Sequence, residues 1–445
     1  VYVLLGFVVL WNFLMIFHAI HPSPASDAAT LLGSRAGFAK TNGRERTRPR
    51  RLDNVTAARH RRQPKDAPCV QIECIYRRAE AMARSFISAQ NQTWRFPAPQ
   101  TSNKAYGGLI YVKVPKTGSS TIAGATLRIA RTHHVEAHYD HSSGEEYGRQ
   151  GRHPTHSFLF SSIRDPAERS LSFLAYESSR TQNHKAMDLA TLLESLRSMD
   201  RLGAVQKSEG RGGTQLAFTS LHSIHKHSAW KPSFPEHVVR ADRVEQHASD
   251  VLKNYDFLLV TERMDESLVA LAMLLRVSVR DVVVFSSKIA ARKAPTSASE
   301  NDHGSRQLVQ AKVDQQFLAI HNKGGGMSCV PLRHIPTELL DDPQTQTFLQ
   351  SDHWHAMNYG DYILHEAATR SLDKTIQDLG RANFQHNLAE YRSIVAKANE
   401  YCIGQVHGPC SSNGTLQLKV ASENCYAGEY GCGHICVDRM IKDFV

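Results

Sequence analysis

The chain has 445 residues, 41% of them hydrophobic, so it can bury a full core as one large domain or two smaller ones. Its formal charge of +10 is concentrated in one segment. Between Arg35 and Lys65 there are eleven Lys and Arg but only two acidic residues, Glu45 and Asp53, so the net charge of the remaining residues is about +1. A nearly neutral folded part lacks the basic surface of a nucleic-acid-binding protein, so no nucleic-acid partner is expected.

Residues 1–20 form an apolar run, interrupted only by Asn12 and His18. A helix of this length just crosses the hydrocarbon core of a bilayer, so the run predicts a transmembrane signal anchor. A signal peptide cleaved after Ala25 is the alternative. The positive-inside rule alone would place the basic residues that follow in the cytoplasm. The sequons and cysteines described below favour the lumen instead.

Residues 21–68 are rich in Pro, Ser, Ala, Asn and Arg and have no apolar period. Such a composition cannot bury enough surface to offset the entropy of ordering, so this segment is expected to be a disordered basic stem. Glycosylation sequons occur at Asn54, Asn91 and Asn413. Together with the N-terminal run they indicate a secreted or lumenal protein.

The first candidate site lies between a predicted buried strand at Gly107–Val114 and a predicted helix at Thr121–Ala130. A glycine-containing turn between strand and helix binds phosphate, because backbone N–H groups and the helix N-terminus point at the anion. The candidate phosphate ligands are Lys116, Thr117, Gly118, Ser119, Ser120 and Thr121. An ordinary strand–helix connection is the alternative. The lysine precedes the glycine, unlike in a Walker A loop, and no metal is expected.

The second candidate site follows the predicted strand Ser157–Ile163. Arg164 comes at the carboxyl end of this strand, where open α/β sheets bind ligands. Pro166 suits the first turn of a helix, and Ser172 lies about two turns along it. Arg164 and Ser172 are therefore candidates to bind a second phosphate. A salt-bridged helix start without a ligand is the alternative.

Taken together, VPKTGSST and SSIRDPAERSLS resemble the 5′-phosphosulfate loop and the 3′-phosphate motif of sulfotransferases that use 3′-phosphoadenosine 5′-phosphosulfate (PAPS). The resemblance implies that Lys116–Thr121 binds the 5′-phosphosulfate, and that Arg164 and Ser172 bind the 3′-phosphate. It also implies an α/β fold of the P-loop-like sulfotransferase type, with a parallel sheet flanked by helices and a helical C-terminal part.

Two further stretches narrow the resemblance. Tyr255–Phe285 combines a strand, an acidic turn, DESL and a leucine-rich helix, and it resembles the galactose 3-O-sulfotransferases, the family of galactosylceramide sulfotransferase. Residues 354–380 resemble the C-terminal helical segment of that family. The resemblance covers most of Gly107–Tyr401. It implies sulfation of the 3-hydroxyl of a terminal galactose on a glycolipid or glycoprotein, by a single-pass type II protein of the Golgi membrane with a lumenal catalytic domain.

The expected domains are therefore the anchor, the stem, a catalytic domain at 69–401 and a Cys-rich tail at 402–445. Residues 294–351 depart from the family pattern as a polar insertion, which puts the sugar specificity in doubt. A uronic acid or an N-acetylhexosamine stays open as the acceptor. A P-loop NTPase and a non-catalytic membrane glycoprotein that keeps the fold are the other classes considered.

Transfer to a sugar hydroxyl requires a base that takes the proton, and histidine is suited to this near neutral pH. Related carbohydrate sulfotransferases have a histidine about two dozen residues before the motif arginine. By this resemblance His141 is the first candidate and His138 the second, with other histidines and Glu145 or Glu146 as alternatives. Lys116 is the candidate for stabilising charge on the departing oxygen.

The sequence contains eight cysteines, and five of them lie in the last 44 residues. An even, clustered set indicates disulfides formed in an oxidising compartment, although the pairing cannot be read from the spacing. A zinc site with Cys432, His434 and Cys436 as ligands is the alternative.

Overall fold

The computed structural model describes residues 71–87, 106–139, 144–147, 151–180, 187–205, 215–220, 241–285, 317–321, 326–402, 404–419 and 432–444. The predicted anchor and stem, the sequons at Asn54 and Asn91, and the candidate base His141 lie outside these residues. Within them, no helix combines the length and the apolar character that a membrane span requires.

The helices and strands follow one another in this order: α2 (Ile72–Met82), β1 (Tyr106–Val112), α4 (Ser119–His133), β2 (Ala137–His138), η1 (Gly144–Tyr147), β3 (Arg152–Ile163), α5 (Pro166–Arg180), α6 (Leu189–Val205), α7 (Gln215–Thr219), α8 (Ala241–Asn254), β4 (Phe257–Val260), η4 (Thr261–Arg263), α9 (Met264–Leu275), η5 (Val279–Val282), β5 (Phe317–His321), β6 (Met327–Pro331), α10 (Thr337–Leu340), α11 (Pro343–Leu349), α12 (Asp352–Met357), α13 (Tyr359–Asp378), α14 (Arg381–Cys402) and α16 (His434–Phe444).

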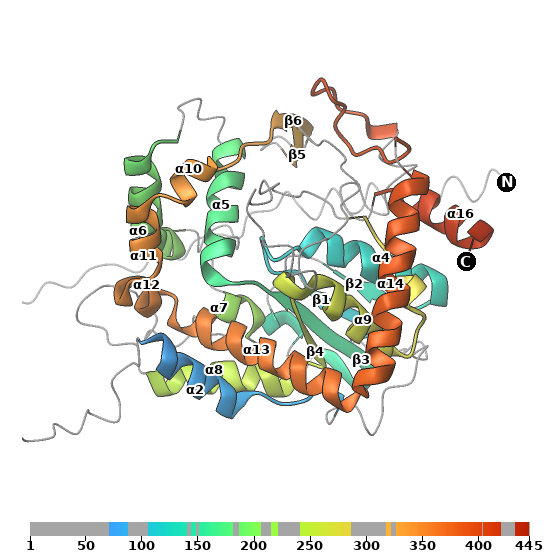
Figure 1. The fold of residues 1–445 in the computed structure, drawn as a ribbon, viewed down its shortest axis with the longest axis horizontal. Helices are drawn as coiled ribbons and strands as arrows, with labels where there is room; N and C mark the ends of the chain where they lie inside the picture. The colour runs from blue at the N-terminus through green and yellow to red at the C-terminus, as the bar shows by residue number, and fades with distance from the viewer. Residues whose placement is uncertain are drawn as a thin grey trace, which may run out of the picture. The chain divides into compact units, whose positions relative to one another are not determined.

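A parallel sheet with the strand order β2-β1-β3-β4 forms the centre of the fold (Figure 1). Helix α4 packs on β1 and β2, and α13 packs on β3 and β4, with α2 and α8 alongside α13. Covering helices explain why β1 and β4 are continuous apolar runs rather than alternating ones. The expected α/β class, with a parallel sheet flanked by helices and a helical C-terminal part, is confirmed.

The order of the strands marks where a ligand is expected. From β1 the chain passes through α4 to β2 on one side, and from β3 it passes through α5–α8 to β4 on the other. The crevice between neighbouring strands whose connections diverge in this way is where open α/β sheets bind ligands. Val112 pairs with Ser161, so the turn after β1 and the turn after β3 leave the sheet side by side.

The predicted strands differ from the observed ones at their ends. Strand β1 stops at Val112, two residues earlier than expected, because the chain then turns into the loop that precedes α4. Strand β3 begins at Arg152 rather than at Ser157, and its pairing with β1 shifts register between Tyr106 and Gly108. The added residues are mostly polar and half-buried, so apolar patterning alone misses them.

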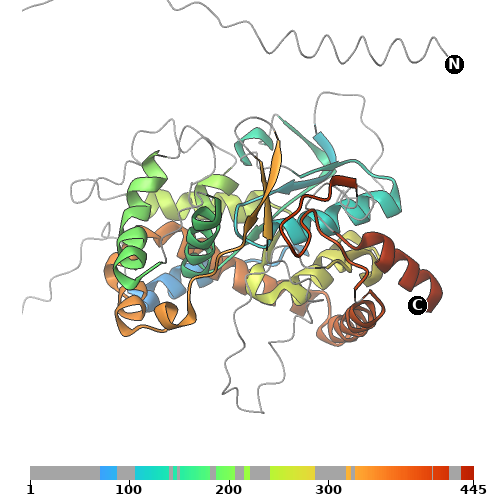
Figure 2. The same cartoon turned by 90° about the horizontal axis from the view of Figure 1, so that it is seen from above.

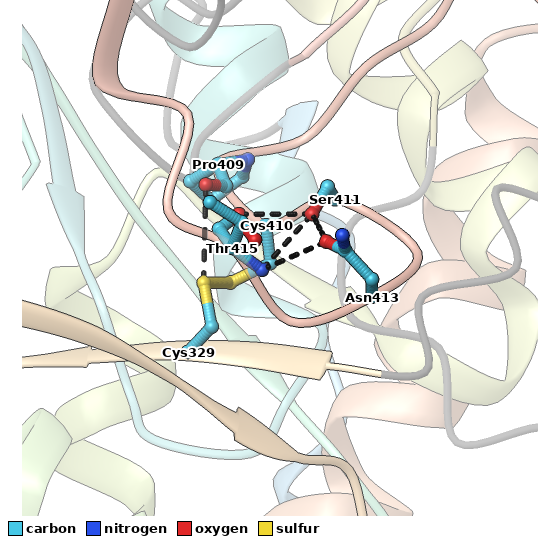
Figure 3. Close-up of a disulfide and its surroundings, with 6 residues drawn as sticks. All are labelled: Cys329, Pro409, Cys410, Ser411, Asn413 and Thr415. Atoms are coloured by element: carbon cyan, nitrogen blue, oxygen red, sulfur yellow. Dashed lines mark hydrogen bonds between the residues drawn. A yellow bond between two sulfur atoms is a disulfide. The ribbon is translucent and has the colours of Figure 1, made fainter.

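Part of the predicted insertion is described. Strands β5 and β6 form an antiparallel hairpin beside α5 (Figure 2), and α10 and α11 follow it. The disulfide Cys329–Cys410 joins β6 to the C-terminal segment (Figure 3), where the Asn413 side chain accepts the backbone N–H of Thr415. A second disulfide joins Cys402, the last residue of α14, to Cys436 on α16.

The cysteines of the alternative zinc site are used in disulfides. Cys436 is bonded to Cys402, and Cys432 is disulfide-bonded as well. A disulfide sulfur has no thiolate to offer a metal, so this set of ligands does not form a zinc centre. Among the residues that the structure describes there is also no other group of His, Cys, Asp and Glu arranged to hold a metal ion.

Candidate functional site

The turn between β1 and α4 is held by its carbonyl oxygens. Arg169 Nε donates to the oxygen of Pro115 at 3.2 Å, and Arg164 Nη1 donates to that of Lys116 at 3.2 Å. The Thr261 hydroxyl donates to that of Thr117 at 2.9 Å. In a planar trans peptide the N–H points away from the C=O, so fixing three successive carbonyls turns the following N–H groups toward the opposite side. Such a row of N–H groups is an anion-binding nest.

Backbone conformation supports the same conclusion. Lys116 and Gly118 both have φ +67°, in the left-handed region, on either side of Thr117. A non-glycine residue held there marks a turn whose conformation the surrounding structure imposes. Gly118 directly precedes α4, so the turn presents its N–H groups next to the N-terminus of a 15-residue helix. The predicted succession of strand, glycine-containing turn and helix is therefore confirmed.

The side chain of Thr117 points into the protein rather than toward the surface of the turn. It is fully buried and donates to the Val114 carbonyl oxygen at 2.9 Å. Its oxygen also lies 2.6 Å from the hydroxyl of Ser162, which in turn lies 2.7 Å from the Tyr111 hydroxyl. This buried chain of hydroxyls ties the turn to β1 and β3. As a candidate phosphate ligand, Thr117 would therefore act through its backbone N–H, because its hydroxyl is used inside the protein.

The turn after β3 begins α5 in a way that fixes Arg164. Asp165 caps the helix by accepting the Glu168 N–H at 2.9 Å, and Pro166 occupies the first helical position. Arg164 therefore stays just outside the helix, at the end of the strand. Its side chain is 22% exposed and lies 3.4 Å from Glu168 and 3.9 Å from Glu262.

The two predicted phosphate motifs are brought together. Because Arg164 donates directly to the Lys116 carbonyl, its guanidinium borders the first turn. The planar group has five N–H donors, so the bonds to the Lys116 carbonyl and to Glu168 leave others for a phosphate. Ser119 and Thr121 are mostly buried at the start of α4, Ser120 is half-buried there, and Ser172 is half-buried on α5.

Lys116 points toward α5. Its ammonium lies 4.5 Å from the centroid of the Tyr176 ring, within range of a cation–π interaction. Tyr176 also packs against Leu318, Ile320 and Val330 of the β5–β6 hairpin. The hairpin, which belongs to the predicted insertion, is thus one side chain away from the lysine.

The second candidate base, His138, lies on the edge strand β2 and pairs with Ile110 of β1. Its ring packs edge-on against Tyr106 with centroids 4.8 Å apart, and its Nε2 lies 3.2 Å from Glu136. Tyr106 is the first residue of β1, whereas the candidate phosphate-binding turn follows the last residue of that strand. The His138 ring therefore packs against the residue at the other end of β1 from the turn. Glu145 and Glu146 lie in η1, and of these alternatives, as of His141, no side-chain placement is described.

Gly118 tests the turn directly. The backbone at Gly118 has φ +67°, and a Cβ added there would lie 2.8 Å from Met264 Cε. We expect Gly118→Ala to lower the free energy of unfolding by about 1–2 kcal/mol and to weaken nucleotide binding as the turn relaxes. Gly380→Ala is the control, because Gly380 has φ +84° with open space around it. Equal loss of nucleotide affinity in both variants, measured by calorimetry, would argue against the role of the turn.

Sequence patterns did not indicate the charged pair Glu262–His365. Glu262 accepts the Asp165 N–H at 3.0 Å, and His365 Nε2 lies 3.2 Å from its other oxygen. Burial would lower the pKa of His365, but the hydrogen bond and charge of Glu262, helped by Asp165 and Glu366, raise it above its ordinary value. Burial would raise the pKa of Glu262, but the hydrogen bond and charge of His365 hold it below its usual range.

These shifts predict how stability depends on pH. The raised histidine pKa stabilises the fold below about pH 6.5, and this contribution is lost as pH rises through the raised value. Glu262, whose pKa is lowered, stabilises the fold at higher pH, and this contribution to stability is lost as pH falls through the lowered pKa. We expect His365→Gln to reduce Tm by about 2 °C more at pH 6 than at pH 9. The exposed His386 on α14 serves as the control, and a loss independent of pH would refute the pairing.

Comparison with known proteins identifies the segment that holds this site. The model of the sulfotransferase family matches residues 102–320, just under half of the chain. No curated protein and no solved structure matches the chain. The matched residues include the turn after β1, the turn after β3 and the strands that bring them together. The segment that carries both phosphate motifs is therefore similar to the sulfotransferase family.

Proposed function

We propose that this chain transfers a sulfuryl group from PAPS to the 3-hydroxyl of a terminal galactose on a glycolipid or glycoprotein. The single observation that carries the proposal is the contact of Arg164 with the Lys116 turn. A nucleotide with phosphates at both ends of one ribose needs two anion sites close together, and the neighbouring strands β1 and β3 supply them.

The residues present fit such a nucleotide. The N–H groups of the turn and the start of α4 suit the 5′-phosphosulfate, and the free donors of Arg164, with Ser172, suit the 3′-phosphate. Gly118 suits such a turn, since its left-handed backbone, with φ +67°, would be strained for a residue with a Cβ. PAPS supplies the activated sulfuryl group in this reaction.

The roles of the protein side chains follow from their positions. Lys116 stabilises the negative charge that develops where the sulfuryl group departs, and Tyr176 holds its ammonium. The base that accepts the sugar proton is sought first at His141 and then at His138, with Glu145 and Glu146 as alternatives. Since the β5–β6 hairpin packs on Tyr176, we place the acceptor side of the site next to the hairpin.

Galactose as the acceptor rests on the resemblance of Tyr255–Phe285, which corresponds to β4, the acidic turn η4 and α9. The resemblance also favours a Golgi enzyme anchored by residues 1–20, with the catalytic domain in the lumen. Disulfides such as Cys329–Cys410 are typical of that oxidising route.

An acceptor panel with labelled PAPS tests the proposal. Glycolipids and glycoproteins ending in galactose are compared with uronic-acid and N-acetylhexosamine acceptors, and the sulfated position is mapped. Label on the galactose 3-hydroxyl supports the proposal, and label on another sugar would replace the acceptor. Binding of adenosine 3′,5′-bisphosphate (PAP) without transfer to any acceptor would indicate a non-catalytic protein. Mg²⁺-dependent ATP turnover would indicate an NTPase.

A further inference from the structure

A buried carboxylate on α13 lies behind both phosphate motifs. Asp361 is 2% exposed, and its Oδ2 lies 3.8 Å from Nη1 of Arg169, whose side chain is 11% exposed. The same Arg169 donates through Nε to the Pro115 carbonyl oxygen at 3.2 Å. A buried arginine needs a counter-charge, so Asp361 allows Arg169 to stay where it holds the phosphate-binding turn. The contact from Asp361 through Arg169 to the turn is the first of two arms by which Asp361 is connected to the phosphate motifs.

The second arm leads from Asp361 to Arg164. The carboxylate oxygens of Asp361 accept the backbone N–H groups of Gln215 at 2.9 Å and Leu216 at 3.0 Å, and so fix the start of α7. The side chain of Gln215 then pairs with the backbone of Arg164 twice: it accepts the Arg164 N–H at 2.8 Å and donates to the Arg164 carbonyl at 2.7 Å. Gln215 is fully buried, so this amide is held in a single orientation.

We infer that Asp361 is a positioning residue that sets the spacing between the two phosphate sites, through Arg169 to the Lys116 turn and through Gln215 to Arg164. This inference rests on the proposed function and goes beyond it. One ribose joins the 5′- and 3′-phosphates and limits the distance between them. The two phosphate sites must therefore be kept at a fixed distance from each other. Asp361 touches neither phosphate site itself and acts through its two arms.

The two arms predict different binding defects, which separates positioning from general stability. Gln215→Leu removes both side-chain bonds to the Arg164 backbone and acts mainly on the 3′-phosphate site, since the turn keeps its bonds from Arg169 and Thr261. We expect it to lower the ratio of PAP affinity to AMP affinity by about 10-fold, with AMP affinity nearly unchanged. Arg169→Lys keeps a charge beside Asp361 but loses the geometry toward Pro115, and we expect it to weaken both nucleotides by about 10-fold with their ratio preserved. Asp361→Asn should combine the two defects.

The measurement is calorimetric titration of PAP and AMP into each folded variant of the full chain. Asp373→Asn is the matched control, because Asp373 lies on the same helix and pairs with Arg263 at 2.6 Å, but its side chain is 58% exposed. It should bind both nucleotides as the wild-type protein does. If Asp361→Asn does not fold, the Gln215 and Arg169 variants decide the question.

Equal losses for PAP and AMP in the Gln215 variant, or wild-type binding in both single-arm variants, would overturn the inference while leaving the proposed function in place. A wild-type protein that binds PAP no better than AMP would instead overturn the proposed nucleotide site, and the inference with it. The two failures are therefore distinguishable in one series of titrations.

Discussion

Replacing Arg164 with alanine is expected to raise the Kd for PAP by about 100-fold and the Kd for AMP by less than about 5-fold. A hydrogen bond to a charged group contributes about 1.5–3 kcal/mol, and each 1.4 kcal/mol is a factor of ten in affinity. The guanidinium can give two such bonds to a 3′-phosphate, which AMP lacks. The small loss for AMP reflects the bond from Arg164 to the Lys116 carbonyl oxygen.

The matched control for this variant is Arg180→Ala. Arg180 lies at the opposite end of α5 and pairs with Glu177 at 3.1 Å, so its removal should leave both nucleotide affinities unchanged. Arg164→Lys should fall in between, because lysine keeps the charge but not the bidentate geometry. If PAP binds Arg164→Ala as tightly as the wild-type protein, the 3′-phosphate does not bind at this arginine.

The second large effect is expected at Lys116. Methionine has a similar length and no charge, and it must adopt the same left-handed backbone as lysine, so Lys116→Met isolates the ammonium group. We expect kcat to fall by about 10³-fold, the size of effect seen when a group that stabilises transition-state charge is removed. PAP binding should change much less, because the N–H groups of the turn remain.

A transfer assay with saturating acceptor, together with PAP titration, checks this result. The informative pattern is a large loss of kcat with a small change in Kd, since that pattern marks an interaction made mainly in the transition state. Lys116→Arg should recover part of the rate. A Lys116→Met protein with near wild-type kcat would remove the lysine from the mechanism and leave it as a structural cation on Tyr176.

The local parts of the site could be predicted from the sequence because their signals are local. An apolar strand, a glycine turn and a helix follow one another at 107–130, and the RDP motif places a capping aspartate and a first-turn proline directly after Arg164. Neighbouring strands then bring the two turns together, as a parallel sheet requires. The sequence did not indicate the hydrogen-bond partner of each side chain. The Thr117 hydroxyl, for example, donates to the Val114 carbonyl oxygen inside the protein.

The supporting network could not be predicted in the same way. Asp361 lies almost 200 residues from Arg164 in sequence, and Gln215 belongs to a five-residue helix with no periodic pattern to reveal it. One signal was present: Asp361, Leu364 and Ala368 share one buried face of α13, and a carboxylate on such a face needs a buried partner. The identity of that partner depends on the tertiary structure.

Two of the disulfides among the described residues carry a consequence for how the chain is made. Cys329 pairs with Cys410 and Cys402 with Cys436, so the two bridges interleave along the sequence. During synthesis Cys402 emerges before Cys410, and pairing in order of emergence would join Cys329 to Cys402, a partner it must later exchange. Such exchange proceeds through mixed disulfides and is slow without an isomerase. A production host that oxidises thiols but does not reshuffle them is therefore expected to accumulate mispaired protein, while co-expressed disulfide isomerase should restore the native bridges.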